Sequence, residues 1–247
     1  MQFRAVLFDV GDTLWHSRGA PAPFEFRRIA AARAAGWLAA AGHRGPDPAG
    51  VARVAWDAVE TAMHKARATD LVEPDYAEAA RAALRCAGLQ ISRDDAGHLL
   101  DAIYVSGTEG GKAAFDDARP VLSALRGRGL LLAAVTNRAF GGERFRDDLR
   151  DAGLDIGWDA ESVSVEVGYL KPHPALFEHA LAELRVRPGE ALMAGNSLAE
   201  DIAGAQRLGI AAAWRRSPPD AEGVTPDFTF DELTELLDLP GLAGPRS

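Results

Sequence analysis

Residues 3–14 read FRAVLFDVGDTL, and this stretch decides the fold. Its first part, residues 3–8, is a short apolar run that predicts a buried β-strand. The strand ends at Asp9, and Gly11 follows in a position suited to a tight backbone turn. A carboxylate at such a strand end can be a reactive group, although an Asp in a turn also has an ordinary structural role.

Three further apolar runs, each flanked by turn-forming residues, predict strands buried on both faces: residues 130–135, 191–194 and 210–214. Amphipathic segments that predict helices lie at residues 143–152, 175–184 and 199–208. Parallel strands need long crossover connections, and helices of this kind supply them. The alternation therefore predicts an α/β fold with a doubly wound, Rossmann-like parallel sheet.

A long stretch of different character, residues 24–104, separates the first strand from the second and is rich in Ala, Arg and Leu with helical spacing. It is broken at GHRGPDP, LVEPD and LQISRDD, so it predicts about four helices without an intervening strand. Ligands of open parallel sheets bind at the carboxyl ends of the strands, where an inserted cap would close over them. The domains we expect are an α/β core of residues 1–16 and 113–240, an all-helical cap of residues 17–112, and a disordered tail of residues 241–247.

The composition restricts the function classes. The chain has 247 residues, and its 27 basic and 36 acidic residues give a net charge of -9, which argues against sequence-independent binding to nucleic acid or to an anionic membrane. No apolar run reaches the roughly 20 residues of a membrane-spanning helix, and MQFRAVLFDV lacks the features of a secretory signal. We therefore expect a cytoplasmic protein, as a monomer or a homodimer, with Cys86 as a buried thiol.

Polar residues follow the predicted strands at their ends or lie in a loop before a helix: Asp9, Thr136, Asn137, Lys171, Asn196 and Asp201. Each has an ordinary explanation when taken alone, as a turn residue, a helix cap or a solvated charge. Because the carboxyl ends of parallel strands meet at one edge of a sheet, their occurrence in this order favours a shared site.

The segments that carry these residues, FDVGDTL, AVTNR, GYLKPHPALF and GNSLAEDIAGAQRLGI, resemble in sequence order the four motifs of the haloacid dehalogenase superfamily. The resemblance covers nearly the whole core and implies a hydrolase in which Asp9 is a nucleophile that forms a covalent intermediate. It implies that Thr136 and Asn137 bind the transferring group of a small anionic substrate, and that Lys171 supplies a fixed positive charge. It also implies Mg²⁺, an ion that prefers oxygen ligands, held by Asp9, the backbone carbonyl of Gly11, Asn196 and Asp201.

The sequence departs from the family pattern at two positions. Phosphatases of the family carry a second Asp, a general acid and base, where this chain has Gly11. The neighbouring Asp12 is either redirected toward the site or, as we favour, a turn residue, and without a proton donor poor leaving groups depart slowly. Asn196 replaces a metal-binding Asp, so Mg²⁺ should bind more weakly unless Glu200 and Asp201 compensate.

Three functions are compatible with these departures. The first, which we favour, is a slow or specialised Mg²⁺-dependent phosphatase of a small phosphorylated metabolite. The second is a metal-independent 2-haloacid dehalogenase, because a halide leaves without a proton and Gly11 is then no handicap. The third is a non-catalytic relative with a binding or regulatory role. We expect the side chains of Arg215 and Arg216 to be solvated and assign His173 to the surface.

Overall fold

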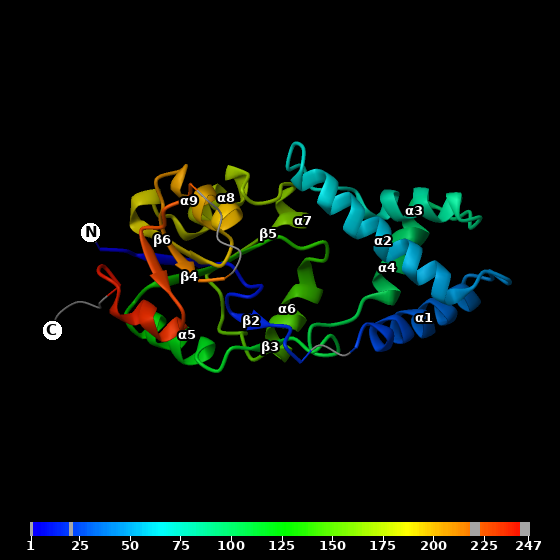
Figure 1. The fold of residues 1–247 in the computed structure, drawn as a ribbon, viewed down its shortest axis with the longest axis horizontal. Coiled ribbons are helices and arrows are strands. Elements are labelled where there is room, and N and C mark those ends of the chain that lie inside the picture. The colour runs from blue at the N-terminus through cyan, green and yellow to red at the C-terminus, as the bar shows by residue number, and fades with distance from the viewer. Residues whose placement is uncertain (1, 20–21, 218–222, 243–247) are drawn as a thin grey trace. The chain divides into compact units, whose positions relative to one another are not determined.

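The computed structural model describes residues 2–19, 22–217 and 223–242. The chain divides into two compact units (Figure 1), a core unit of Met1–Arg18 with Lys112–Ser247 and a helical unit of Gly19–Gly111. Of the tail expected at 241–247, residues 243–247 lie outside the described residues. The carbonyl of Gly241 accepts a hydrogen bond from the N–H of Phe3 at 3.0 Å, and Leu242 is buried in the core.

A six-stranded parallel sheet forms the centre of the core unit, and its strand order is β5-β4-β1-β6-β7-β8. The bounds of these strands are β1 Ala5–Phe8, β4 Leu131–Thr136, β5 Ala160–Val163, β6 Ala191–Gly195, β7 Ala211–Arg215 and β8 Phe228–Phe230. The central strand, β1, is the apolar run that precedes Asp9. The predicted α/β fold class is therefore confirmed.

Alternate residues of β1 enter two different hydrophobic clusters, since successive side chains of a strand point to opposite faces. Val6 and Phe8 belong to a cluster that includes residues of α5 (Ala118–Gly127) and α6 (Gly142–Asp151). Ala5 and Leu7 belong to the other cluster, with residues of α8 (Pro174–Leu184). The remaining short helices of the core are α7 Ser164–Val167, η1 Pro188–Glu190, η2 Leu198–Ile202, α9 Ala203–Gln206 and η3 Leu233–Asp238.

Two short strands, β2 (Trp15–His16) and β3 (Ala113–Ala114), pair as an antiparallel ribbon. Trp15 pairs with Ala114 and His16 pairs with Ala113. The segments before and after the helical unit are therefore joined to each other by strand pairing.

The helical unit contains α1 Pro23–Ala40, α2 Pro48–Arg67, α3 Tyr76–Cys86 and α4 Arg93–Ile103. Each predicted break contains the N-cap of the next helix, namely Asp47, Asp75 and Ser92, whose side chains accept hydrogen bonds from backbone N–H groups of the first turn. Cys86 is exposed, so the expectation of a buried thiol was wrong. It is the last residue of α3.

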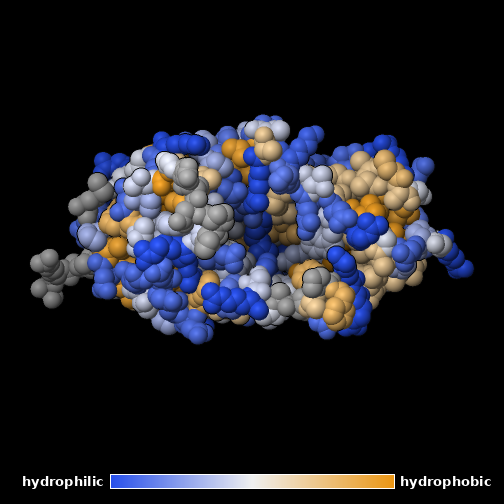
Figure 2. Space-filling view, viewed as in Figure 1, coloured by the Kyte–Doolittle hydropathy of each residue, from blue (hydrophilic) through white to orange (hydrophobic). Residues whose placement is uncertain are grey.

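The two units differ in the polarity of the side chains that they expose. Figure 2 shows hydrophilic residues over much of the core unit and more apolar side chains over the helical unit on the same face. In the described part of the chain, the exposed large hydrophobic residues are Phe24 and Val72. None of the described helices is both long enough and apolar enough to span a membrane.

Candidate active site

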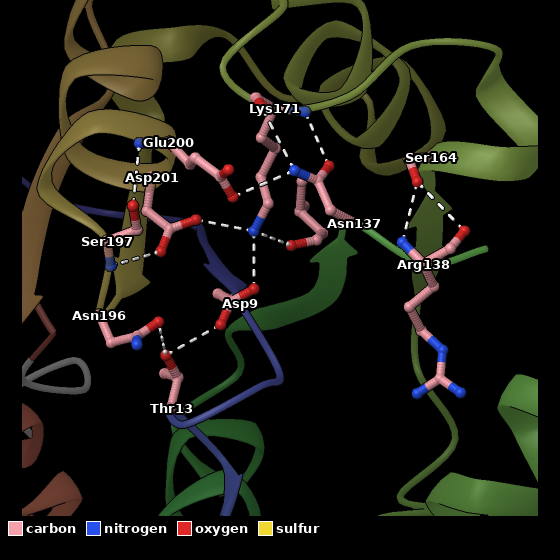
Figure 3. A network of polar contacts seen from close by, with 11 residues as sticks. Asp9, Thr13, Asn137, Arg138, Ser164, Lys171, Asn196, Ser197, Glu200 and Asp201 are labelled. Atoms are coloured by element: carbon pink, nitrogen blue, oxygen red, sulfur yellow. Dashed lines mark hydrogen bonds and ion pairs between the residues drawn. The ribbon is translucent and has the colours of Figure 1, made fainter. Parts of the chain in front are cut away.

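Asp9 directly follows β1, and its backbone extends the pairing with β6 by donating to the carbonyl of Ala194 at 2.9 Å. Its side chain is buried, with a residue exposure of 7%. One carboxylate oxygen accepts from Lys171 Nζ at 2.7 Å, and the other accepts from the Thr13 hydroxyl at 3.1 Å (Figure 3). The sheet therefore fixes a carboxylate whose two oxygens have different partners.

The ammonium group of Lys171 is fully engaged inside the core. It donates to Asp9 Oδ1 at 2.7 Å, to Asp201 Oδ1 at 2.7 Å and to the carbonyl oxygen of Val135 at 2.8 Å. These three bonds use all three of its N–H donors. Burial alone would lower the pKa of Lys171, but the carboxylates of Asp201 and Asp9 outweigh burial and raise it above its usual value. Lys171 is therefore a permanent positive charge.

The charge balance around Asp9 is negative, because two buried carboxylates share one ammonium group. Burial raises the pKa of Asp9 to about 6, against the opposing effect of Lys171 and with a further contribution from the charge of Asp201. A second positive charge near Asp9 would stabilise its ionised form.

Asn137 holds the loop that carries Lys171. Its Oδ1 accepts from the backbone N–H of Lys171 at 2.7 Å, and its Nδ2 donates to the Lys171 carbonyl oxygen at 3.2 Å and to Glu200 Oε2 at 3.1 Å. The side chain of Asn137 is thus occupied by protein, whereas the backbone N–H groups around it are the ones that we expected to bind the substrate. Any contact of this residue with a ligand would fall to its backbone.

Thr136 is the last residue of β4 and is 4% exposed. Its strand lies next to β1, with Phe8 paired to Ala134, so both Asp9 and Thr136 sit at the same edge of the sheet. No other described residue hydrogen-bonds to the Thr136 hydroxyl. This hydroxyl is therefore available to a ligand.

Asp201 lies behind Lys171 and has a partner on each oxygen. Besides Lys171, it accepts from the backbone N–H of Ser197 at 2.9 Å. A Cβ added to Gly195 would overlap the Asp201 carboxylate, so only glycine permits this close approach. We expected Asp201 among the metal ligands, and in this structure each of its oxygens accepts one hydrogen bond from a protein donor.

A different pair of oxygens converges near Asp9. The Thr13 hydroxyl lies 3.1 Å from Asp9 Oδ2 and 3.4 Å from Asn196 Oδ1. The described residues contain no group of three or more His, Cys, Asp or Glu side chains arranged to hold a metal ion. One carboxylate and one amide oxygen still fit Mg²⁺, which accepts few protein ligands and keeps several waters. This donor set provides one negative charge.

The loop after Asp9 makes a tight turn, in which the N–H groups of Leu14 and Trp15 both donate to the Val10 carbonyl. Asp12 is exposed and has a positive φ of 56°, a backbone conformation that Asp tolerates better than most residues. This agrees with a turn role for Asp12. A Cβ added to Gly11 would meet no atom within 4 Å, so the position has room for a side chain.

Two residues that support this loop were not found from the sequence. Thr13 was passed over within FDVGDTL, and Arg215 was expected to be solvated. Arg215 is instead 7% exposed, donates to the Thr13 carbonyl oxygen at 2.6 Å and lies 3.5 Å from the centre of the Phe115 ring. Its position at the end of β7 was the available signal, because Asp9 and Thr136 also lie at strand ends. The neighbouring Arg216 pairs with Asp231 on the surface.

His173, which we assigned to the surface, caps α8. Its Nδ1 accepts from the backbone N–H of Ala175 at 3.2 Å, and its ring stacks on Tyr169 with a centroid distance of 3.9 Å. It therefore positions the helix that follows Lys171.

Comparison with known protein families identifies the class of protein to which this fold and site belong. Residues 3–209 match the haloacid dehalogenase-like hydrolases, and the chain belongs to this family. The family predicted from the four motifs is therefore confirmed.

Particular relatives carry phosphatase names. The chain is 36% identical over 125 residues to a phosphoserine phosphatase of Thermus thermophilus, over 50% of this chain and 49% of that protein. It is 32% identical over 131 residues to a glyceraldehyde 3-phosphate phosphatase of Methanopyrus kandleri, over 51% of this chain and 55% of that protein. The chain thus spans about half the length of these curated relatives.

Solved structures match over nearly the whole chain. A 2-haloacid dehalogenase from Pseudomonas syringae pv. Tomato is 26% identical, with a TM-score of 0.66 and coverage of 96% of this chain and 97% of that chain. A HAD phosphatase from Thermococcus onnurineus, at 23% identity and a TM-score of 0.61, covers 100% of both chains and supports the fold alone.

Proposed function

We propose that this hydrolase is a Mg²⁺-dependent phosphatase of a small phosphorylated metabolite, acting in the cytoplasm through a phosphoaspartate on Asp9. The observation that carries the proposal is the buried ion pair of Asp9 with Lys171 at 2.7 Å, at the same edge of the sheet as the end of β4 that carries Thr136. The phosphatase names of the relatives support it.

Asp9, Thr136 and Lys171 have different roles in the first step, in which the phosphoryl group is transferred to Asp9. The Thr136 hydroxyl and the backbone N–H groups that follow β4 bind the phosphoryl oxygens. Lys171 offsets part of the repulsion between the phosphate and the Asp9 carboxylate and keeps that carboxylate aligned. A bond forms between an Asp9 oxygen and phosphorus while the bond from phosphorus to the leaving oxygen breaks. Water then hydrolyses the acyl phosphate, which releases inorganic phosphate and regenerates Asp9.

Asp9 Oδ2 and Asn196 Oδ1 would hold Mg²⁺, with the Gly11 carbonyl as a further oxygen in the same loop. When bound, the ion supplies the positive charge that this site lacks and offsets the charge of the phosphate. Asp201 is assigned to Lys171 and not to the ion.

Gly11 restricts the substrates. It cannot protonate the leaving oxygen, so esters whose leaving groups are stable as anions should react faster than alkyl esters. Aryl phosphates and acyl phosphates are of this kind.

A haloacid dehalogenase is the second candidate, and Gly11 is the observation that favours it. A halide leaves without a proton, so the missing carboxylate costs this reaction nothing. The fold similarity to the Pseudomonas dehalogenase agrees with it.

The experiment that tests the proposal varies both the substrate and the presence of Mg²⁺. Release of phosphate from 4-nitrophenyl phosphate is measured with Mg²⁺ and with EDTA, for the wild type and Asp9→Asn, and acid-quenched protein is searched by mass spectrometry for phosphate on Asp9. Phosphatase activity that needs Mg²⁺ and Asp9 supports the proposal. Chloride release from 2-chloropropionate in EDTA would support the dehalogenase instead. Activity of Asp9→Asn equal to the wild type would exclude both mechanisms, and a protein without either activity would point to a binding role.

A further inference from the structure

Lys112 is the residue at which the chain returns to the core unit, and it lies against the loop of Asp9. Its Nζ is 5.1 Å from the centre of the Trp15 ring. The residue is half-buried, and no described residue hydrogen-bonds to its ammonium group, on which the carboxylates of Asp148 and Asp12 act only as nearby charges. A half-buried ammonium group without a hydrogen-bond acceptor is unfavourable unless a ligand supplies one.

A second cation, Arg138, lies over the same ring. Its guanidinium carbon is 5.4 Å from the centre of the Trp15 ring, and its charge is balanced by an ion pair with the buried Asp148 at 2.5 Å. Burial lowers the pKa of Lys112 and the positive charge of Arg138 lowers it further, against the opposing effect of the carboxylates of Asp148 and Asp12. Arg138 is thus held in a close ion pair inside the protein, whereas the Lys112 ammonium group has no contact ion pair and can bind an anion.

Trp15 and Arg138, the two residues that Lys112 lies near, belong to segments of the proposed phosphate site. Trp15 belongs to the tight turn after Asp9, where it bridges to Gly11. Arg138 follows Thr136 and Asn137, and its backbone N–H donates to Ser164 Oγ at 2.9 Å. In Figure 3 the Arg138 side chain extends away from Lys171. Lys112 and Arg138 therefore lie over one ring, that of Trp15, between the segments that carry Asp9 and Thr136.

We propose that Lys112 is a specificity-determining residue that binds a second anionic group on the leaving-group side of the phosphomonoester. The substrate class is then a phosphate ester that also carries a carboxylate or a second phosphate, and esters of neutral alcohols are poorer substrates. This inference rests on the proposed phosphatase function. The competing structural role, in which Lys112 only covers the Trp15 ring, predicts no dependence on the charge of the leaving group.

A matched pair of substrates separates the two roles. Phenyl phosphate and 3-carboxyphenyl phosphate differ by one carboxylate, and both have aryl leaving groups. For Lys112→Gln, we expect the ratio of kcat/KM for the carboxylate ester to kcat/KM for phenyl phosphate to fall about tenfold, mainly through KM, as for loss of one charged hydrogen bond. Lys112→Arg should restore part of the ratio.

The control is Lys65→Gln in the helical unit, which should leave the ratio at the wild-type value. An unchanged ratio in Lys112→Gln, or an equal loss on both substrates, would overturn the inference.

A second measurement does not depend on turnover. The chain has three lysines, Lys65, Lys112 and Lys171, and all three Lys171 donors are used within the protein. Acetylation by a limiting amount of acetic anhydride, read by peptide mass spectrometry with Lys65 as reference, reports the access to Lys112. Adding 3-carboxybenzylphosphonate should protect Lys112 at least threefold more than benzylphosphonate does.

Failure of the phosphatase proposal and failure of the Lys112 inference give different results. If the wild type hydrolyses neither ester but the carboxylate still protects Lys112, the phosphatase proposal fails and the anion site remains. If hydrolysis occurs but neither the ratio nor the protection depends on Lys112, the phosphatase proposal remains and this inference is wrong.

Discussion

Lys171 Nζ lies 2.7 Å from Asp201, the same distance that separates it from Asp9, so one buried cation serves two carboxylates. Removing it by Lys171→Met should leave both carboxylates buried without a counter-ion. We expect the free energy of unfolding to fall by about 3–5 kcal/mol and activity to be lost. Urea titrations at pH 7 measure the first effect. The double variant Lys171→Met with Asp201→Asn should recover part of the stability and none of the activity. Equal stability of both variants would argue against the shared-cation interpretation.

Asp9→Asn should abolish activity without destabilising the fold. The pKa of about 6 for folded Asp9 lies above its ordinary value of 3.8, so stability linked to its protonated form is present below about pH 4 and lost as the pH rises through 6. In EDTA at pH 7 the variant should therefore be more stable than the wild type, by an amount on the order of 1 kcal/mol. The difference should shrink at pH 4.5. Denaturant titrations at both pH values check this, and a less stable variant at pH 7 would contradict it.

Gly11→Asp should extend activity to poorer leaving groups. The position has room for a side chain, and a carboxyl there could donate a proton to the leaving oxygen. We expect kcat on an alkyl phosphate to rise about 10²-fold, with a smaller gain on 4-nitrophenyl phosphate. Gly11→Asn has a similar shape but no transferable proton, so it should show no such gain. Equal effects of the two substitutions would mean that proton transfer is not the missing step.

Asn196→Asp should strengthen Mg²⁺ binding, because it adds a second negative charge to an oxygen pair that faces Thr13. Isothermal titration calorimetry should show an affinity about tenfold higher or more, given the energy of a unit charge at contact distance. In EDTA the same variant should unfold at a lower denaturant concentration, since it adds a carboxylate to a site with excess negative charge. If the variant binds Mg²⁺ more tightly but is not less stable than the wild type in EDTA, the new carboxylate does not lie close to Asp9.

Gly195→Ala tests the packing behind Lys171. Its methyl group would overlap the Asp201 carboxylate, which cannot move without breaking its bonds to Lys171 and Ser197. We expect a loss of about 2–4 kcal/mol in the free energy of unfolding together with a loss of activity. Gly189→Ala is the matched control, since a Cβ there meets no atom within 4 Å. Thermal unfolding of the two variants side by side gives the comparison.

The sequence predicted the parts of the fold that are apolar and continuous. The strands that became β1, β4, β6 and β7 were found within one or two residues of their ends, because strands buried on both faces contain little else than apolar residues. The strand β5, whose sequence is AESV, was missed. Its Ser162 is fully buried, and its hydroxyl donates to the Leu176 carbonyl oxygen at 2.7 Å. This hydrogen bond compensates for the burial of a polar group, and no local pattern reveals it.

The candidate site shows the same limit. Asp9, Thr136 and Lys171 were predicted from strand ends and motif order, and the structure brings Asp9 and Lys171 into contact. The partners of the other residues depend on contacts across the sheet. Asn137 is turned to the Lys171 backbone and Arg215 to the Thr13 carbonyl, 202 positions apart in sequence. Such distant pairs depend on tertiary packing, which the local patterns of residue types do not reveal.

The ribbon of β2 and β3 has an evolutionary consequence. The chain leaves the core unit just after His16 and returns just before Ala113, two residues that are strand partners. An ideal Cβ on Gly19 would lie 3.5 Å from the carbonyl oxygen of Gly111, so the two ends of the inserted segment are neighbours as well. An insertion whose ends meet can be lengthened, shortened or exchanged without rethreading the sheet. The residues at the strand ends that carry out the chemistry can thus be inherited unchanged, while the inserted segment varies and the range of substrates changes with it.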